Sequence, residues 1–251
     1  MREIFLCGNW VSGGTDHEGH ARITGNARYE KGKGMRYQCL VLDHDDTVVN
    51  STATVNFPAF LETLRQLRPG AEMTLEQYFR YNFDPGFTSL CYDLLSFTEE
   101  EMQIQVDNWA AYVRTHAPEP FDGMRELLWR FHNEGGHICV SSHSMRENIL
   151  RDYALHGFPE PELIFGWDLP ANRRKPSPYG LEQIMEQLHL LSEELVMVDD
   201  LKPGKDMADA AGVDFIAAGW AHQIPEIADF MRRECSVYCA SVRDLEKFLF
   251  E

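Results

Sequence analysis

The chain has 251 residues, of which 44% are hydrophobic and 25% are charged, the ordinary composition of a globular protein with one large domain or a core and a smaller insert. A formal net charge of −17 would repel a nucleic-acid backbone, so we expect neither DNA nor RNA as a partner. No apolar run approaches the roughly 20 residues that span a bilayer and no signal peptide opens the chain, so we expect a cytoplasmic protein with no membrane partner.

The predicted elements begin after an N-terminal stretch of different texture. Residues 1–35 are rich in glycine and show no helical period, and we expect a flexible or small added extension there. From Tyr37 onward, strands that are apolar throughout alternate with amphipathic helices. The expected strands are CLVLD (39–43), ICVSS (138–142), LIF (163–165), LVMVDD (195–200), VDFIAA (213–218) and SVYC (236–239). This pattern predicts an α/β fold, a Rossmann-like doubly wound parallel sheet with helices on both faces.

Residues 56–117 interrupt this alternation, because they contain no strand-like run. A helical stripe and two threonine-capped acidic helix starts, TLEQ and TEEE, predict an inserted α-helical domain. Residues 36–55 and 118–251 would then form the α/β core. We interpret the stripe of Trp109, Tyr112 and Val113 as the insert's own core rather than as a surface that reads a substrate.

Polar residues follow three of the strands at their carboxyl ends, the edge where open parallel sheets bind ligands. They are DHDDT at 43–47, Ser141 with Ser142, and Asp199 with Asp200, while Lys175 follows the short strand 163–165. Several carboxylates at one edge repel one another unless a hard cation lies between them, and Mg²⁺ prefers oxygen ligands. A lysine and hydroxyl groups would hold a phosphoryl group, and a carboxylate can act as a covalent nucleophile.

In content and order these motifs resemble the phosphatase branch of the haloacid dehalogenase (HAD) superfamily. That family's D-x-D-x-T motif is matched by CLVLDHDDT, its second strand motif by ICVSS, its K-P-x-P motif by KPSP, and its acidic fourth motif by VMVDDLKPGKDMADAAG. The resemblance covers residues 37–251. Within the family, the chain is similar to the phosphoglycolate phosphatase and β-phosphoglucomutase-like branch. The resemblance implies a HAD-like core, a helical C1-type cap formed by the insert, and a phosphoric monoester hydrolase.

The resemblance also implies catalytic roles for the matched residues. Asp43 would be the nucleophile and a magnesium ligand. Asp45 would protonate the leaving oxygen and then activate water, while its backbone carbonyl binds the metal. Lys175 would stabilise the charge on Asp43 and on the phosphoryl group.

Further roles implied by the resemblance concern the metal and the phosphate. Asp200 would be the second side-chain ligand of Mg²⁺, with Asp199 beside it. Thr47 and either Ser141 or Ser142, of which we favour Ser141, would hold phosphate oxygens.

One residue inside the first motif and one residue just after the second receive separate interpretations. The family usually has a small residue, most often glycine, where this chain has Asp46, so we expect the Asp46 side chain to point outward or to cap a turn. We interpret His143 as a packing residue outside the site.

The expected reaction is Mg²⁺-dependent hydrolysis of a small phosphorylated metabolite through an aspartyl-phosphate, with the cap excluding water and reading the leaving group. A phosphosugar mutase of the same family is an alternative, although such mutases carry a histidine where this chain has Val55. Asp45 and Asp200 argue against a dehalogenase, and the absence of lysine from 56–117 argues against a phosphonate hydrolase. The alternative from another class is a catalytically silent binding or regulatory protein. The sequence leaves the physiological substrate open, and we expect a monomer or a weak homo-oligomer.

Overall fold

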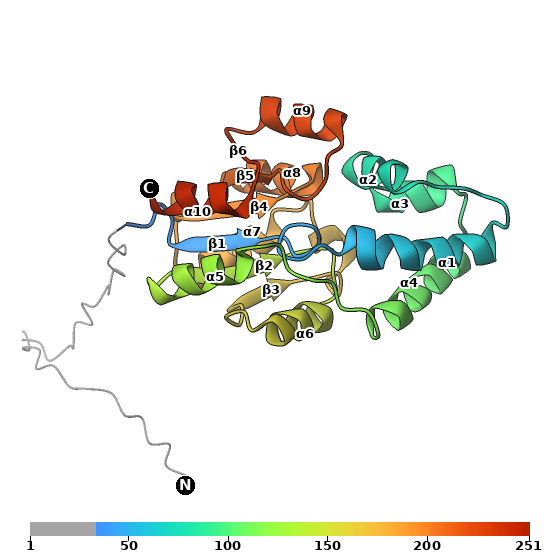
Figure 1. The fold of residues 1–251 in the computed structure, drawn as a ribbon, viewed down its shortest axis with the longest axis horizontal. Helices are drawn as coiled ribbons and strands as arrows, with labels where there is room; N and C mark the ends of the chain where they lie inside the picture. Colours follow the sequence, from blue (N-terminus) through green and yellow to red (C-terminus); the bar gives the residue numbers. More distant parts are fainter. Residues whose placement is uncertain (1–33) are drawn as a thin grey trace, which may run out of the picture. The chain divides into compact units, whose positions relative to one another are not determined.

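The computed structural model describes residues 34–251, so the extension predicted for residues 1–35 lies almost entirely outside the described part. Six strands form one parallel sheet in the order β3-β2-β1-β4-β5-β6 (Figure 1). The strands are β1 (Cys39–Leu42), β2 (His137–Ser141), β3 (Leu163–Phe165), β4 (Leu195–Asp199), β5 (Asp214–Ala218) and β6 (Val237–Cys239). The predicted doubly wound α/β fold is confirmed.

Each face of the sheet packs against its own layer of helices, because side chains alternate along the buried strands. Leu40 and Leu42 of β1 face a cluster formed with α5 (Met124–Asn133), α6 (Arg146–His156) and α10 (Val242–Phe250). Cys39 and Val41 face the opposite layer, which consists of α7 (Tyr179–Leu188), α8 (Lys202–Ala211) and α9 (Pro225–Glu234). Two short 3₁₀ turns, Ala171–Arg173 and Ser192–Glu194, complete the core.

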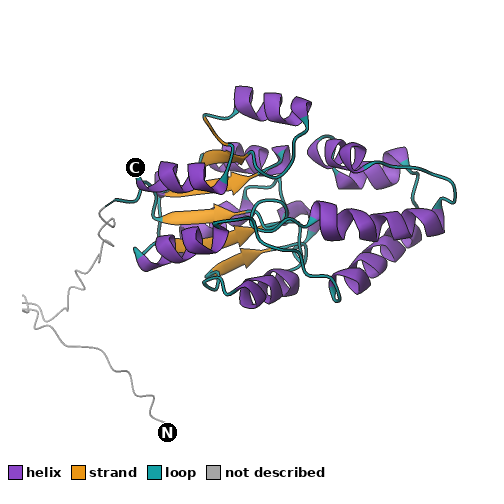
Figure 2. Ribbon diagram, in the orientation of Figure 1, coloured by secondary structure: helices purple, strands orange, loops and turns teal. Residues whose placement is uncertain are grey.

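The insert between β1 and β2 is entirely helical, as predicted. It comprises a π-helical turn at Thr52–Asn56, α1 (Phe57–Leu67), α2 (Leu75–Phe83), α3 (Phe87–Ser89), a second π-helical turn at Leu90–Leu94, and α4 (Glu99–Val113). Capping boxes begin α2 and α4, where the hydroxyls of Thr74 and Thr98 accept backbone N–H groups. The strands point toward these helices in Figure 2, so the insert covers the carboxyl-terminal edge of the sheet.

Helix α2 also contacts the core beyond that edge. The Phe79 ring lies 4.9 Å from the His222 ring, and the Phe83 ring lies 5.1 Å from the Phe230 ring of α9. These contacts hold the insert against the α9 side of the sheet. Across residues 34–251, the helices are too short or too polar to serve as a membrane span.

The insert has a hydrophobic cluster of its own, centred on the fully buried Phe60. Replacing Phe60 with alanine should lower the stability of the insert by about 3–5 kcal/mol, because it removes a large buried side chain and leaves a cavity. Hydrogen exchange of the α1 and α4 amides measures this loss. Leu94→Ala, at a side chain that is 49% exposed, serves as the control and should change exchange little. If Phe60→Ala lowers the stability of the insert by less than about 1 kcal/mol, Phe60 is not the centre of its hydrophobic cluster.

Candidate active site

A pocket of about 340 Å³ lies between the carboxyl ends of the strands and the insert. On the core side it is lined by Asp43, which follows β1, and by Asp199 and Asp200 at the end of β4. On the insert side it is lined by Gln105 and Trp109 of α4. The carboxylates that the sequence placed on two strand ends therefore meet in one cavity, because β1 and β4 are adjacent and parallel.

Lys175 joins the carboxylates of the two strands. Its Nζ lies 2.9 Å from Asp43 Oδ1 and 2.6 Å from Asp199 Oδ2, and all three side chains are buried. Burial alone would lower the pKa of Lys175, but the charges of Asp199 and Asp43 outweigh it and raise the pKa well above its usual value. The lysine is therefore a fixed positive charge beside Asp43.

Asp200 is the least compensated acid of the pocket. Oxygen atoms of Asp43, Asp199 and Asp200 lie within 4.8 Å of one another, and neither oxygen of Asp200 accepts a hydrogen bond within residues 34–251. Burial, followed by the charges of Asp46, Asp199 and Asp43, raises the pKa of Asp200 well above its usual value. Nearby His222, 3.8 Å away, offers no compensation, because burial lowers its pKa to about 4. Buried, unpartnered carboxylate oxygens form a donor set that fits a hard divalent cation such as Mg²⁺.

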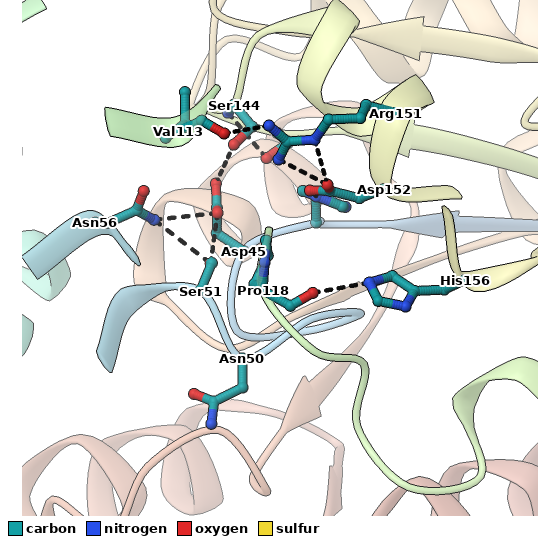
Figure 3. Close-up of polar contacts among 12 residues, drawn as sticks. Asp45, Asn50, Ser51, Asn56, Val113, Pro118, Ser144, Arg151, Asp152 and His156 are labelled. Carbon is teal, nitrogen blue, oxygen red and sulfur yellow. Dashed lines mark hydrogen bonds and ion pairs between the residues drawn. The ribbon is translucent and has the colours of Figure 1, made fainter. Parts of the chain in front are cut away.

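Asp45 is held by three hydrogen-bond donors, which converge on its carboxylate in Figure 3. Ser51 Oγ at 2.5 Å and Asn56 Nδ2 at 3.1 Å donate to Oδ1, and Ser144 Oγ at 2.6 Å donates to Oδ2. Burial acts to raise the pKa of Asp45, but the charge of His44 and these three donors hold it below its usual value. The carboxylate is therefore ionised at neutral pH and fixed in orientation.

A second hydrogen bond connects this group to helix α4 of the insert. Trp109 Nε1 donates to Asn56 Oδ1 at 2.9 Å, which turns the Asn56 amide so that Nδ2 faces Asp45. Since Trp109 lines the pocket, our interpretation of it as part of the insert's core was wrong. Val113, from the same stripe, is buried as expected.

Asp46 adopts a left-handed backbone conformation, with φ of +57°. Glycine adopts this conformation without strain and aspartate tolerates it, which accounts for the small residue that the related motif usually has there. Asp46 Oδ1 accepts the Thr52 N–H at 3.1 Å, so the side chain caps a turn rather than pointing outward. Burial is the main cause that raises the pKa of Asp46 to about 8, so it is largely neutral at pH 7.

The three hydroxyls predicted to bind phosphate occupy different surroundings. Thr47 Oγ1 is buried and has no hydrogen-bond partner among the described residues. Ser141 Oγ lies 3.5 Å from Met207 Sδ, and Ser142 Oγ accepts the Ser144 N–H at 3.1 Å. The hydroxyls that donate to a pocket carboxylate are those of Ser51 and Ser144, and neither was predicted from the sequence, although Ser144 lies just beyond the ICVSS segment.

His143 lines the pocket, so our interpretation of it as an outside packing residue was wrong. Burial, helped by the charge of Lys175, lowers its pKa to about 4, and its neutral ring donates Nε2–H to the Lys175 carbonyl at 3.0 Å. Gln105, Trp167 and Arg174 also line the pocket, and no sequence motif indicated them.

The family model described as haloacid dehalogenase-like hydrolase matches residues 40–218. Pyrophosphatase PpaX of Halalkalibacterium halodurans is 24% identical over 195 residues, which are 74% of this chain and 86% of that protein.

Two solved structures are similar to this chain in fold. A haloacid dehalogenase-like hydrolase from Bacteroides fragilis has a TM-score of 0.71 at 18% identity, covering 83% of this chain and 99% of that one. CbbY from Rhodobacter sphaeroides, in complex with xylulose-(1,5)bisphosphate, has a TM-score of 0.65 at 18% identity, covering 82% and 94%.

Asp200→Asn should separate the cost of the buried charge from its use in binding metal. Without metal, the variant should be more stable by about 1–2 kcal/mol, because a buried, repelled carboxylate is removed. Mg²⁺ at 100 times its Kd should stabilise the wild type by about 2.7 kcal/mol and the variant far less. Thermal unfolding with and without Mg²⁺ measures both effects, with Asp229→Asn on the exposed side of α9 as the control. Equal stabilisation of wild type and Asp200→Asn by Mg²⁺ would contradict the metal assignment.

Proposed function

Because the chain belongs to the haloacid dehalogenase-like hydrolases and is a phosphatase of that family, we propose that it hydrolyses a small phosphomonoester through an aspartyl-phosphate formed on Asp43. The observation that carries this proposal is the ion pair of Asp43 with Lys175 in a pocket covered by the insert. A carboxylate fixed beside a permanent positive charge can attack phosphorus while that charge stabilises the transferring group.

The reaction proceeds in two steps. An oxygen of Asp43 attacks phosphorus, the ester oxygen leaves with a proton from Asp45, and the aspartyl-phosphate remains. Water then attacks the phosphorus while Asp45 takes its proton, which releases phosphate and restores Asp43. The ionised Asp45 is the form that the second step needs, and the approach of a dianionic substrate raises its pKa toward the form that the first step needs.

Charge compensation in this proposal comes from Mg²⁺ and Lys175. Asp43, Asp200 and the Asp45 carbonyl would hold the ion, with Asp199 beside them, and the ion would supply positive charge for the phosphoryl oxygens. Asp199 also accepts from Lys175, which fixes the ammonium group next to Asp43. We propose that Thr47 and one of Ser141 and Ser142 bind phosphate oxygens, since both strand-end segments adjoin the carboxylates.

The insert, proposed here as a cap over residues 56–117, would enclose the ester and read its leaving group. Simple hydrolysis is favoured over phosphosugar transfer because Val55 is 3% exposed and apolar, so no acid–base group stands at that position. A small phosphorylated metabolite is the substrate class that fits a pocket of about 340 Å³.

Asp43→Asn tests the nucleophile. With Mg²⁺ and 4-nitrophenyl phosphate, the variant should lose about 10³-fold or more in kcat, because an amide oxygen is a poor nucleophile for phosphorus. Asp229→Asn removes an exposed carboxylate outside the pocket and should keep full activity. If the chain is a catalytically silent binding protein, neither the wild type nor the variants should turn over the ester. Turnover that survives Asp43→Asn would refute the proposed nucleophile.

Trp109→Phe tests the hydrogen-bond connection to Asp45. Loss of the indole N–H frees the Asn56 amide, so kcat should fall about tenfold for an alkyl phosphate, whose leaving oxygen needs a proton, and much less for 2,4-dinitrophenyl phosphate. Trp129→Phe is the matched control, because that indole donates to the Gly157 carbonyl on the surface. Equal losses with both esters would mean that Trp109 acts only in packing.

A further inference from the structure

The pocket has an unusual balance of charge. Five acidic side chains line it, of which that of Asp46 is largely neutral, and within residues 34–251 only two lysine or arginine side chains do so, Lys175 and Arg174. Lys175 is already paired with Asp43 and Asp199. Arg174 is the pocket cation that forms no ion pair with the described residues, and Asp168 acts on its charge only from beyond ion-pair distance.

Arg174 is held in place by contacts that leave most of its donors free. Its guanidinium carbon lies 4.1 Å from the centroid of the Trp167 ring, and its Nε donates to the Leu169 carbonyl at 2.7 Å. Neither terminal nitrogen forms a hydrogen bond or ion pair within residues 34–251. Asp168, earlier in the same connection after β3, accepts the Arg146 N–H at 2.8 Å and acts on Arg174 only through its charge, without an ion pair or hydrogen bond to it.

The support beneath Arg174 is itself fixed. Trp167 packs with its ring at right angles to the His143 ring, 5.7 Å away, and His143 donates to the carbonyl of Lys175. Burial lowers the pKa of Arg174 from its usual value, with Asp168 acting in the opposite direction, but a guanidinium stays charged at neutral pH. A partly desolvated, preoriented guanidinium binds carboxylate or phosphate oxygens more strongly than a mobile surface arginine does.

These contacts have a consequence for the leaving group. A phosphate ester that binds with its phosphoryl group at Asp43 would extend toward the remaining lining of the same pocket, which includes Arg174. A neutral leaving group would leave the guanidinium partly buried without an anion. A carboxylate or phosphate on a short spacer would supply that anion and would fit a pocket of about 340 Å³.

We propose that the substrate is a phosphomonoester whose leaving group carries a second anionic group, a carboxylate or a phosphate, and that Arg174, held on Trp167, binds this group. The inference rests on the proposed phosphatase function and assigns its substrate class. Arg174 then determines specificity, while Lys175, the next residue in the chain, serves the transferring phosphoryl group.

Matched pairs of esters test this proposal in the presence of Mg²⁺. The first pair is 3-phosphoglycerate and glycerol 3-phosphate, which differ in a carboxylate. The second is propane-1,3-diol bisphosphate and its monophosphate, which differ in a phosphate. In at least one pair, the wild type should favour the ester with the second anionic group by about tenfold or more in kcat/KM, as expected for a charge-assisted contact. The pair with the larger ratio identifies the second group as carboxylate or phosphate.

Variants of two neighbouring arginines assign the ratio to one side chain. Arg174→Gln should bring the ratio of kcat/KM values close to 1, and Arg174→Lys should leave an intermediate ratio, because it keeps the charge but loses the forked donor geometry. Arg173→Gln removes the same charge from an exposed residue stacked on Tyr179 and should keep the wild-type ratio. Thermal unfolding of each variant reports whether it is folded. If Arg174→Gln does not fold, Arg174→Lys provides the test.

The outcomes separate this inference from the function on which it rests. Turnover that depends on Asp43 but shows no preference in either pair would overturn the Arg174 assignment alone. A ratio that Arg174→Gln leaves unchanged would overturn it as well. If the wild type hydrolyses none of the four esters and no aryl phosphate, both the proposed function and this inference fail.

Discussion

The buried ion pair that Lys175 forms with Asp43 and Asp199 is the interaction on which the site depends. Five carboxylates line one pocket, and without this lysine two of them would face each other across adjacent strands with no cation between them. The lysine lowers that repulsion but leaves the oxygens of Asp200 without a partner among residues 34–251, at a cluster of carboxylates that could hold a cation. Charge compensation thus explains both the fixed orientation of Asp43 and the fit to Mg²⁺.

The fold produces this arrangement through two local features. Adjacent parallel strands β1 and β4 end side by side, so Asp43 and Asp199 face the same layer of helices. Helix α8 then approaches Asp199 so closely that a Cβ on Gly204 would lie 2.1 Å from Asp199 Oδ2. Only a residue without a side chain fits there, so the glycine allows the carboxylate to keep its place beside Lys175.

The strand-end residues could be predicted from the sequence because a parallel sheet places all its carboxyl ends at one edge, whatever the details of packing. Asp43, Asp199 and Asp200 belong to this class, whereas Lys175 lies beyond the end of β3 and was indicated by the K-P-x-P motif. The places of Trp109 and His143 in the pocket could not be predicted from the sequence, because they depend on how a helix is rotated and which way a ring points. For Asp46 the sequence left two orientations open, outward or capping a turn, and its raised pKa follows from a burial that no residue type reveals.

The most direct measurement of the central claim is chemical trapping of the phosphorylated enzyme. An acyl phosphate is reduced by borohydride to an alcohol, so enzyme quenched during turnover and then reduced would carry homoserine in place of the modified aspartate. We expect peptide mass spectrometry to find homoserine at position 43 in the wild type, only when both substrate and Mg²⁺ are present. Homoserine at another aspartate, or steady turnover with no trapped residue at all under conditions that trap a control acyl phosphate, would contradict the account.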